Sequence, residues 1–227
     1  MKLFKVLLVA AGLLVLVTAP VLANEPGTWT LRAGVGTVQP DSHNLTFTDE
    51  GDTIMIDVDN GTSMTLSGTY MFSENWAFDI LASLPFSHDI KATADVPGVG
   101  METAKIGDTR QLLPTVSFQY HFAPDADFQP YVGLGVNWTT FFDTDLVSEF
   151  EADGIDKLSL DDSFGLAGQI GGDWQLNETW VVNLDVRFID IETDATVQGP
   201  DVDGKLNIGT VKVDPWVYSV NLGYRFQ

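Results

Sequence analysis

Residues 216–226 read WVYSVNLGYRF. Every second side chain in this stretch is large and apolar, while Ser219, Asn221 and Arg225 stand between the apolar positions. A repeat of two is the repeat of a β-strand, because successive side chains of a strand point to opposite faces. The stretch therefore predicts a strand with one apolar face and one polar face.

The same alternation occurs in seven other segments. The eight predicted strands lie near residues 28–39, 62–72, 76–86, 115–122, 132–139, 163–174, 180–188 and 216–226. Three connections are short, at Ser73–Asn75, Ala123–Asp127 and Asn177–Thr179, and four are long, at Asp41–Gly61, Asp89–Thr109, Asp143–Leu160 and Ile191–Thr210. This pattern is typical of outer-membrane proteins. It predicts an all-β fold, an eight-stranded antiparallel transmembrane β-barrel with short periplasmic turns and four long extracellular loops.

Aromatic residues on the apolar face lie near both ends of the strands, as expected for rings at the headgroup level of a membrane. They are Trp29, Phe72, Trp76, Phe122, Trp174, Trp180, Tyr224 and Phe226 near the short turns, and Phe86, Trp138, Phe142 and Trp216 near the long loops. A soluble barrel, such as a lipocalin, would turn this face inward. The bulky positions are too numerous for so narrow an interior, so we expect the apolar face to meet lipid.

The first 23 residues are typical of a secretory signal peptide. Lys2 and Lys5 accompany an apolar run from Val6 to Val17, and Val21-Leu22-Ala23 resembles a small-residue cleavage site. The run is short for a membrane span, and no stop-transfer pattern follows it. We expect cleavage near Ala23, which leaves residues 24–227 as the outer-membrane β-barrel.

Acidic residues dominate the charge of the chain. Without Lys2 and Lys5, 9 basic and 32 acidic residues remain, a formal charge of −23. Phosphates would be repelled by this charge, so we expect no nucleic-acid partner. The chain has no cysteine, which excludes disulfides, thiol catalysis and cysteine-based metal clusters.

Several segments, in the order of the predicted strands, resemble the outer membrane protein W family. They are LPFSHDI (84–90), PYVGLGVNWTTFF (130–142), LSLDDSFG (158–165), AGQ (167–169), DPWV (214–217) and GYRF (223–226). The resemblance covers essentially the whole mature chain. It implies an eight-stranded barrel with a narrow, partly hydrophobic lumen that passes small hydrophobic molecules across the outer membrane. It also implies sideways release of cargo into the bilayer, and for some members a role as bacteriocin receptor.

The lumen departs from the family pattern at one position. Family members narrow the lumen with an inward Leu and an inward Trp, and the resemblance places Leu81 at the first position but Arg187 at the second. With Asp79 and Asp185 these residues form the expected constriction. The other expected lumen residues are the polar cluster Arg32, Gln119, His121, Asp173 and Arg225, and His88 and Phe141 at the lumen mouth. Both a polar channel and a salt-bridged plug of side chains fit this set.

Catalysis and metal binding by histidine are not indicated. His43, His88 and His121 are far apart in the sequence, without metal-ligand spacing. Ser87 beside His88 suggests the acyl-chemistry enzymes that use similar barrels, but neighbours in a strand point to opposite faces. We expect no enzyme activity, no catalytic residue, no metal site and no cofactor.

Acidic segments in the predicted loops suggest a further hypothesis, which is the binding of divalent cations. Residues 57–61, DVDNG, are one residue short of an EF-hand pattern, so an acidic turn with positive φ at Asn60-Gly61 is favoured. Carboxylate pairs at Asp201 and Asp203, or at Glu149 and Glu151, are candidates for weak divalent-cation binding that bridges to lipopolysaccharide.

The predicted function is a porin-like outer-membrane channel for small, largely hydrophobic molecules. The alternative is a structural or receptor barrel with a plugged lumen, whose acidic loops bind partners or cation-bridged lipopolysaccharide. The expected partners are outer-membrane lipid and lipopolysaccharide, small hydrophobic ligands and the outer-membrane assembly machinery. That machinery reads the terminal aromatic of the family, which is followed here by Gln227.

Overall fold

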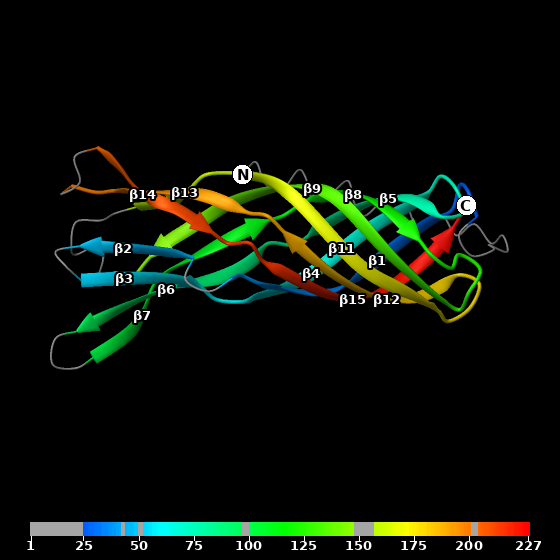
Figure 1. The fold of residues 1–227 in the computed structure, drawn as a ribbon, viewed down its shortest axis with the longest axis horizontal. Coiled ribbons are helices and arrows are strands. Elements are labelled where there is room, and N and C mark those ends of the chain that lie inside the picture. The colour runs from blue at the N-terminus through cyan, green and yellow to red at the C-terminus, as the bar shows by residue number, and fades with distance from the viewer. Residues whose placement is uncertain (1–24, 42–43, 50–51, 97–99, 148–156, 201–203) are drawn as a thin grey trace.

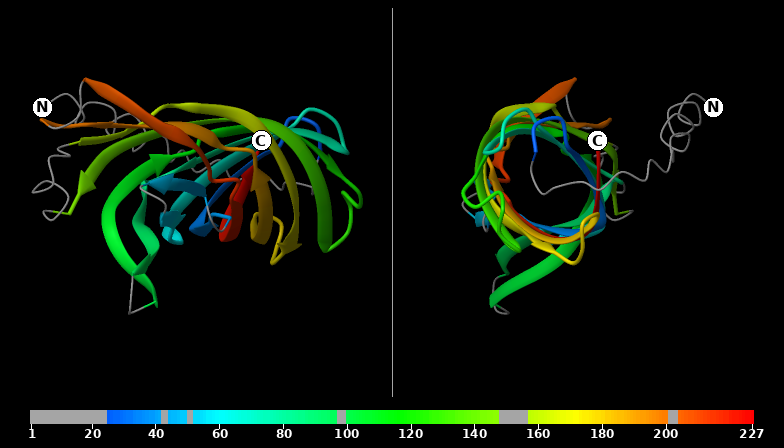
Figure 2. Two further views of the ribbon diagram at one scale, coloured as in Figure 1. Left: turned by 60° about the vertical axis from the view of Figure 1, so that its left-hand side comes forward. Right: turned by 90° about the vertical axis from the view of Figure 1, so that its right-hand side faces the viewer.

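Eight antiparallel strands close into a barrel in the computed structural model, which describes residues 25–41, 44–49, 52–96, 100–147, 157–200 and 204–227. Around the ring they are β1 (Trp29–Gln39), β4 (Gly61–Met71), β5 (Trp76–Ser83), β8 (Thr115–His121), β9 (Phe128–Leu146), β11 (Ser163–Gln175), β12 (Trp180–Ile189) and β15 (Trp216–Phe226). The last strand returns to the first, with Phe226 opposite Trp29. Figure 2 shows the closed ring end-on. The predicted fold class is confirmed.

Large parts of the four long connections are also strands. They contain β2 (Leu45–Asp49), β3 (Asp52–Val58), β6 (Phe86–Val96), β7 (Gly100–Leu112), β10 (Lys157–Leu160), β13 (Glu192–Gln198) and β14 (Lys205–Lys212). One sheet continues from β9 through β7, β6 and β3 to β2, and β10, β13 and β14 form a second sheet. Figure 1 shows these strands carrying the wall well beyond the barrel. They lack the run of outward apolar residues that marks a lipid-facing strand, which is why they were predicted to be loops.

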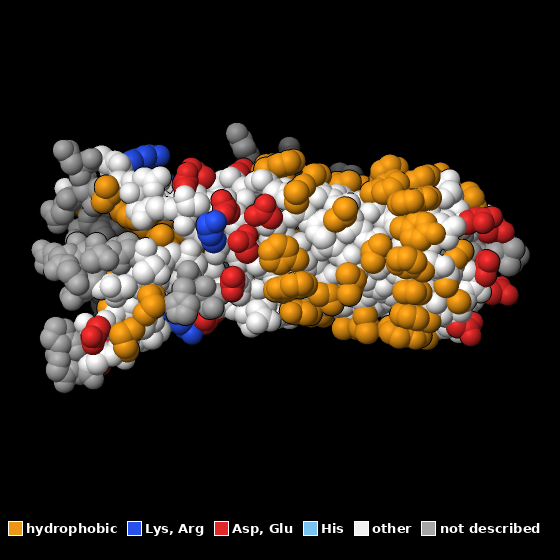
Figure 3. All heavy atoms as spheres, in the orientation of Figure 1, with side chains coloured by type: hydrophobic (Ala, Val, Ile, Leu, Met, Phe, Trp, Pro, Cys, Tyr) orange, Lys and Arg blue, Asp and Glu red, His pale blue; other side chains and the backbone are white. Residues whose placement is uncertain are grey.

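The outer surface of the barrel is apolar. Side chains more than two-thirds exposed include Leu134, Phe164 and Leu166, which lie on β9 and β11. Figure 3 shows bands of apolar side chains across the face of the barrel in view, with acidic side chains at both borders of this region. The apolar face therefore points outward, toward lipid.

One predicted girdle residue points the other way. Phe86 is fully buried, whereas the prediction placed it on the lipid face. Leu84 and Pro85 are consecutive exposed residues, so the alternation shifts by one between β5 and β6. Before residue 85 the even-numbered side chains face outward. After it the even-numbered side chains face inward, and His88 and Ile90 are buried. Pro85 lacks the N–H that a continuous strand requires, which explains why the strand predicted over 76–86 ends early.

The predicted signal peptide lies outside the described residues. Within the described part of the chain, no helix has the length and apolar character needed to cross a membrane.

Candidate functional site

Ion pairs fill the lumen in the half nearest the short turns. Arg187 Nη2 lies 2.7 Å from Asp79 Oδ2, and Arg187 Nε lies 2.6 Å from Asp185 Oδ1. All three side chains are at most 4% exposed. The structure thus brings together the three charged residues that the sequence analysis assigned to the constriction.

A second group of ion pairs adjoins the first. Arg32 makes a forked contact with Asp173, with Nη2 to Oδ2 at 2.6 Å and Nε to Oδ1 at 3.2 Å. Arg225 Nη2 lies 2.5 Å from Gln129 Oε1 and 3.5 Å from Asp173 Oδ2. Arg32 also contacts Thr69 and Asp79, which links the two groups. Three arginines thus face three aspartates in a buried network of zero formal charge, which we call the ionic plug.

Neutral polar residues complete the ionic plug. Tyr131 donates its hydroxyl to Asp185 Oδ2 at 2.7 Å, and Asn183 donates Nδ2 to Asp173 Oδ1 at 2.8 Å. His121 Nε2 lies 3.1 Å from Gln119 Oε1, beside the Tyr131 ring. Buried charges persist only when paired and hydrogen-bonded in this way. Tyr131 and Asn183 were not assigned to the site from the sequence, although the alternation of β9 and β12 places both on the lumen side.

On the side of the long connections, an apolar layer of the lumen adjoins the ionic plug. Leu81 and Ile189 follow Asp79 and Arg187 by two positions on the same strand faces, and both are buried. They belong to one buried apolar cluster with Phe86, and this cluster extends into the strands beyond the barrel. Leu81, the expected apolar side of the constriction, therefore lies in the apolar layer.

A cavity of about 60 Å³ lies within that cluster. Its apolar lining residues are Leu45, Ile56, Val58, Ile90, Ile106, Phe141, Leu158, Leu160, Ala195, Ile208, Val211 and Val213, and its polar lining residues are His88, Thr109, Gln111 and Thr193. His88 and Phe141, the residues expected at the lumen mouth, both line this cavity. We call it the apolar chamber.

His88 is held by two hydrogen bonds in the wall of the apolar chamber. Nδ1 donates to the Asp59 carbonyl at 2.7 Å, and Nε2 lies 3.0 Å from Gln111 Nε2. This part of β6 lies beyond the lipid-facing band, and burial lowers the pKa of His88 below its usual value of 6.5. Ser87 points to the opposite, exposed face. The two residues are therefore not placed as nucleophile and base.

Gly61 makes room for His88. A Cβ at Gly61 would lie 2.6 Å from His88 Cε1 and 2.8 Å from the Ser87 carbonyl oxygen. The sequence predicted a positive φ at Asn60-Gly61, but neither residue is among the described positions with positive φ. The expectation was wrong, because this glycine serves close approach and not turn geometry.

The barrel wall has an interruption beside the apolar layer. Leu81 pairs with Thr115, and the next pair along the same two chain segments is Phe86 with Gln111. Pro85 and Pro114, both exposed, lie between these pairs and cannot donate ladder hydrogen bonds. Phe86 and Leu113 are buried directly inside the interruption. At this point side chains, and not a continuous ladder of backbone hydrogen bonds, separate the apolar layer from the surrounding lipid.

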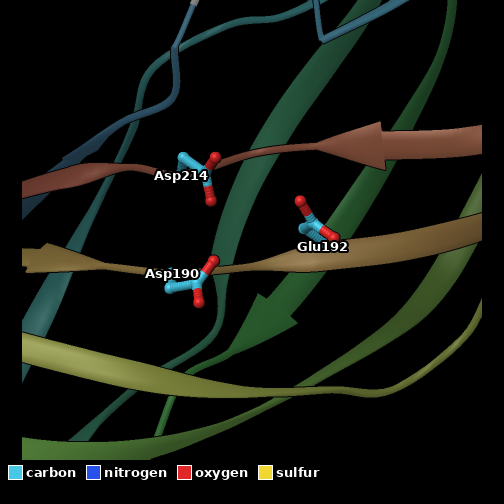
Figure 4. Close-up of side chains that lie close together, drawn as sticks. All are labelled: Asp190, Glu192 and Asp214. Atoms are coloured by element: carbon cyan, nitrogen blue, oxygen red, sulfur yellow. The ribbon is translucent and has the colours of Figure 1, made fainter.

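Three carboxylates cluster just beyond the lipid-facing band. Asp190, Glu192 and Asp214 have oxygens within 4.8 Å of one another (Figure 4). Lys212 Nζ lies 2.5 Å from Glu192, and partial burial, with Asp190 and Glu192 beside it, raises the pKa of Asp214. This cluster was not expected from the sequence. The carboxylates that were proposed for cation binding, at 149, 151, 201 and 203, lie outside the described residues.

Known proteins of one family match nearly the whole chain in sequence and in structure. The sequence model of the OmpW family matches residues 25–226. Outer membrane protein W of Vibrio cholerae is 38% identical over 218 residues, 95% of this chain and 96% of the relative. Outer membrane protein W of Escherichia coli is 35% identical over 224 residues, 98% of this chain and 99% of the relative. The crystal structure of OprG from Pseudomonas aeruginosa has a TM-score of 0.79 at 38% identity and covers 91% of this chain and 99% of OprG.

Proposed function

Because the chain belongs to the OmpW family and is an outer-membrane barrel, we propose that it carries small, largely hydrophobic molecules from the cell exterior into the outer membrane. The route runs into the apolar chamber, along the apolar layer, and sideways into the bilayer at the interruption between Pro85 and Pro114. No catalytic step is part of this proposal.

This proposal rests on the division of the lumen into the ionic plug and the apolar layer. An apolar solute moving straight through the barrel would have to separate buried ion pairs of the ionic plug, such as Arg187 with Asp79, and a buried charge without its partner is costly. Sideways movement past Phe86 and Leu113 keeps the solute among apolar groups. Transfer from apolar protein to lipid tails exposes no apolar surface to water, which would cost about 25 cal/mol per Å².

A second candidate function rests on the ionic plug itself. A barrel closed by buried ion pairs fits a structural or receptor role, in which the extracellular strands bind protein partners or, through divalent cations, lipopolysaccharide. The alternating aromatic residues of β15 support recognition by the outer-membrane assembly machinery under either function, and Gln227 after Phe226 leaves that alternation intact.

An uptake assay with a blocked chamber tests the leading function. Ala195 is 1% exposed and lines the apolar chamber, so Ala195→Phe fills it. Ala33 is exposed on the lipid face, which makes Ala33→Phe a matched control. Cells that lack the native gene and express Ala195→Phe should take up a labelled alkane several-fold more slowly than cells with wild type or Ala33→Phe.

Equal uptake by the wild-type and deletion strains would reject the transport function and leave the structural or receptor role. Heat-modified gel mobility of each variant shows whether equal amounts of folded barrel reach the outer membrane.

A further inference from the structure

We propose that a groove on the lipid-facing wall of the barrel binds one acyl chain of a zwitterionic phospholipid from the periplasmic leaflet. The groove is centred on Gly168 of β11, and we call it the outer groove. It shares no lining residue with the apolar chamber, so this inference is independent of the proposed transport function.

Two neighbouring rows of outward side chains line the outer groove, which has a volume of about 680 Å³. The successive partners of the first row, on β8, β9, β11 and β12, are Tyr120, Val132, Ile170 and Val186. Those of the second row, which continues to β15, are Phe118, Leu134, Gly168, Phe188 and Trp216. Because the strands of such barrels are tilted, these rows run diagonally from the short-turn border toward the long connections.

Gly168 leaves the middle of the groove uncovered. Apart from its chain neighbours, a Cβ at Gly168 would meet no described atom within 4 Å. Other glycines of the outer face are covered, since a Cβ would lie 3.4 Å from Leu31 at Gly68 and 2.3 Å from the Phe128 ring at Gly172. The most exposed large apolar side chains of the described residues surround Gly168 on β9 and β11, each at least 62% exposed: Leu134, Phe164, Leu166 and Ile170. An apolar partner therefore has to complete the packing of this face.

Aromatic rings hold both ends of the groove in place. At the short-turn end, the ring centroid of Trp76 lies 4.7 Å from those of Phe118 and Tyr120. At the other end, the rings of Phe188 and Trp216 are 5.4 Å apart. A flexible hydrocarbon chain that follows the groove gains van der Waals contacts along its length, which is what stabilises association inside a membrane.

Charge at the short-turn end favours a head group with an ammonium. The three short turns contain no lysine or arginine, and their carboxylates are Glu74, Asp125, Asp127 and Glu178. Figure 3 shows acidic side chains at this end of the molecule. Asp125 and Asp127 are exposed in the turn that joins β8 to β9, whose Tyr120 and Val132 line the groove. They attract the ammonium of a zwitterionic phospholipid and repel an anionic one.

Carboxylates at the other end disfavour lipopolysaccharide as the occupant. Asp214 lies two residues before Trp216 and clusters with Asp190 and Glu192. One cation, Lys212, pairs with Glu192, so three carboxylates and one ammonium leave this group negative. The phosphates of a lipopolysaccharide whose acyl chain entered the groove would face this charge. The charges at both ends thus assign the chain to a zwitterionic lipid of the periplasmic leaflet.

Spin-labelled lipids in phosphatidylcholine nanodiscs at low ionic strength test the outer groove. A small fraction of phosphatidylethanolamine with a spin label on one acyl chain should broaden the methyl signals of Leu134 and Val186. Val35 and Leu66, on the opposite side of the ring, should broaden less. The depths are comparable, because Leu134, Val35 and Leu66 each lie six residues from an aromatic residue at the short-turn end.

The head group is tested with phosphatidylglycerol that carries the same labelled chain. Phosphatidylethanolamine should broaden the groove signals about 1.4- to 5-fold more strongly, which is the range for exposed ion pairs. Asp125→Asn together with Asp127→Asn should bring this ratio close to one. Glu25→Gln together with Glu178→Gln removes the same charge outside the β8–β9 turn and should retain most of the preference.

The acyl chain is tested by filling the groove. Gly168→Leu places its side chain in open space, so the barrel should fold, and the excess broadening of Leu134 and Val186 should disappear. Ala33→Leu adds a side chain to the lipid face of β1 and should leave that excess unchanged. Heat-modified gel mobility shows that each variant is folded.

Equal broadening on the two sides of the wild-type barrel, or an excess that persists in Gly168→Leu, would overturn the site. A stronger effect of labelled phosphatidylglycerol, or of labelled lipid A, would overturn the zwitterionic assignment. If the wild-type barrel is a dimer that Gly168→Leu converts to a monomer, a second copy of the chain covers the groove and the lipid site is wrong.

Discussion

Arg187 on β12 and Asp79 on β5 form an ion pair across the full width of the lumen. These strands stand opposite each other in the ring of eight, and Arg187 Nη2 lies 2.7 Å from Asp79 Oδ2. The same guanidinium also pairs with Asp185 on its own strand. A single side chain therefore connects two opposite sides of the barrel.

Replacing Arg187 tests the energetic role of this contact. Arg187→Met leaves Asp185 buried without a cation and Asp79 with only its 3.7 Å contact to Arg32, which should cost about 3–5 kcal/mol of unfolding free energy. Urea unfolding in lipid vesicles measures the loss. Arg110→Met, which breaks the exposed pair with Asp143, should have little effect. Equal stability of Arg187→Met and wild type would contradict the assignment, and Arg187→Met combined with Asp79→Asn and Asp185→Asn should recover part of the loss.

Restoring the ladder tests the sideways exit. Pro85→Val together with Pro114→Val supplies the two missing N–H groups and favours extended backbone. The barrel should become at least as stable, while uptake of a labelled alkane should fall several-fold. Pro124→Val, in a short periplasmic turn, is the control. Unchanged uptake in a well-folded double variant would place the exit elsewhere.

Gly61 should not tolerate a side chain. In Gly61→Ala, a Cβ 2.6 Å from His88 Cε1 must displace the imidazole and break its bonds to Asp59 and Gln111. The expected cost is about 1–3 kcal/mol in stability of the extracellular strands, because buried polar groups lose partners. Gly68→Ala is the comparison, since its Cβ would meet Leu31 at 3.4 Å. Hydrogen exchange on β6 and β7 should rise in the first variant only.

Low pH should weaken the same region. Burial lowers the pKa of His88 in the folded protein, so below about pH 6.5 the unfolded chain binds the proton more readily and the folded state loses stability. Asp59 opposes this effect, because its negative charge raises the pKa of His88 to a smaller extent, and its carboxylate is paired with Lys91 at 2.5 Å. The free energy of local opening at Thr109 and Gln111, from hydrogen exchange at several pH values, should fall below pH 6.5. In His88→Asn it should not, and equal pH dependence in both proteins would remove His88 as the cause.

The sequence predicted the barrel strands well because lipid imposes a clean alternation on them. All eight segments are strands of the ring, and Trp29, Leu134 and Trp216 point outward as expected. The strands beyond the barrel were missed, because water on the outside imposes no such pattern. Phe86 was placed on the wrong face, since the shift at Leu84 and Pro85 depends on how two chain segments meet.

The lumen was harder to predict than the wall. Alternation indicates that Arg32 and Asp173 face inward, but it does not show which inward residues meet across the barrel. Those contacts depend on the tilt and stagger of the strands. Through β15 and β12, the sheet register places Arg32 of β1 level with Gln175 of β11, two residues from Asp173, although β1 and β11 are not neighbours. The apolar chamber depends on β10, β13 and β14, which the sequence analysis did not recognise as strands.

Paramagnetic NMR in lipid nanodiscs tests the central claim most directly, that apolar cargo reaches the chamber and leaves without crossing the ionic plug. A spin-labelled alkane should broaden the methyl signals of Ala195 and Val213, which line the chamber, and of the lipid-facing Val132. Val181, fully buried beside Arg32 of the plug, should stay sharp. Broadening of Val181 together with the chamber residues, or broadening of Val132 alone, would contradict the account.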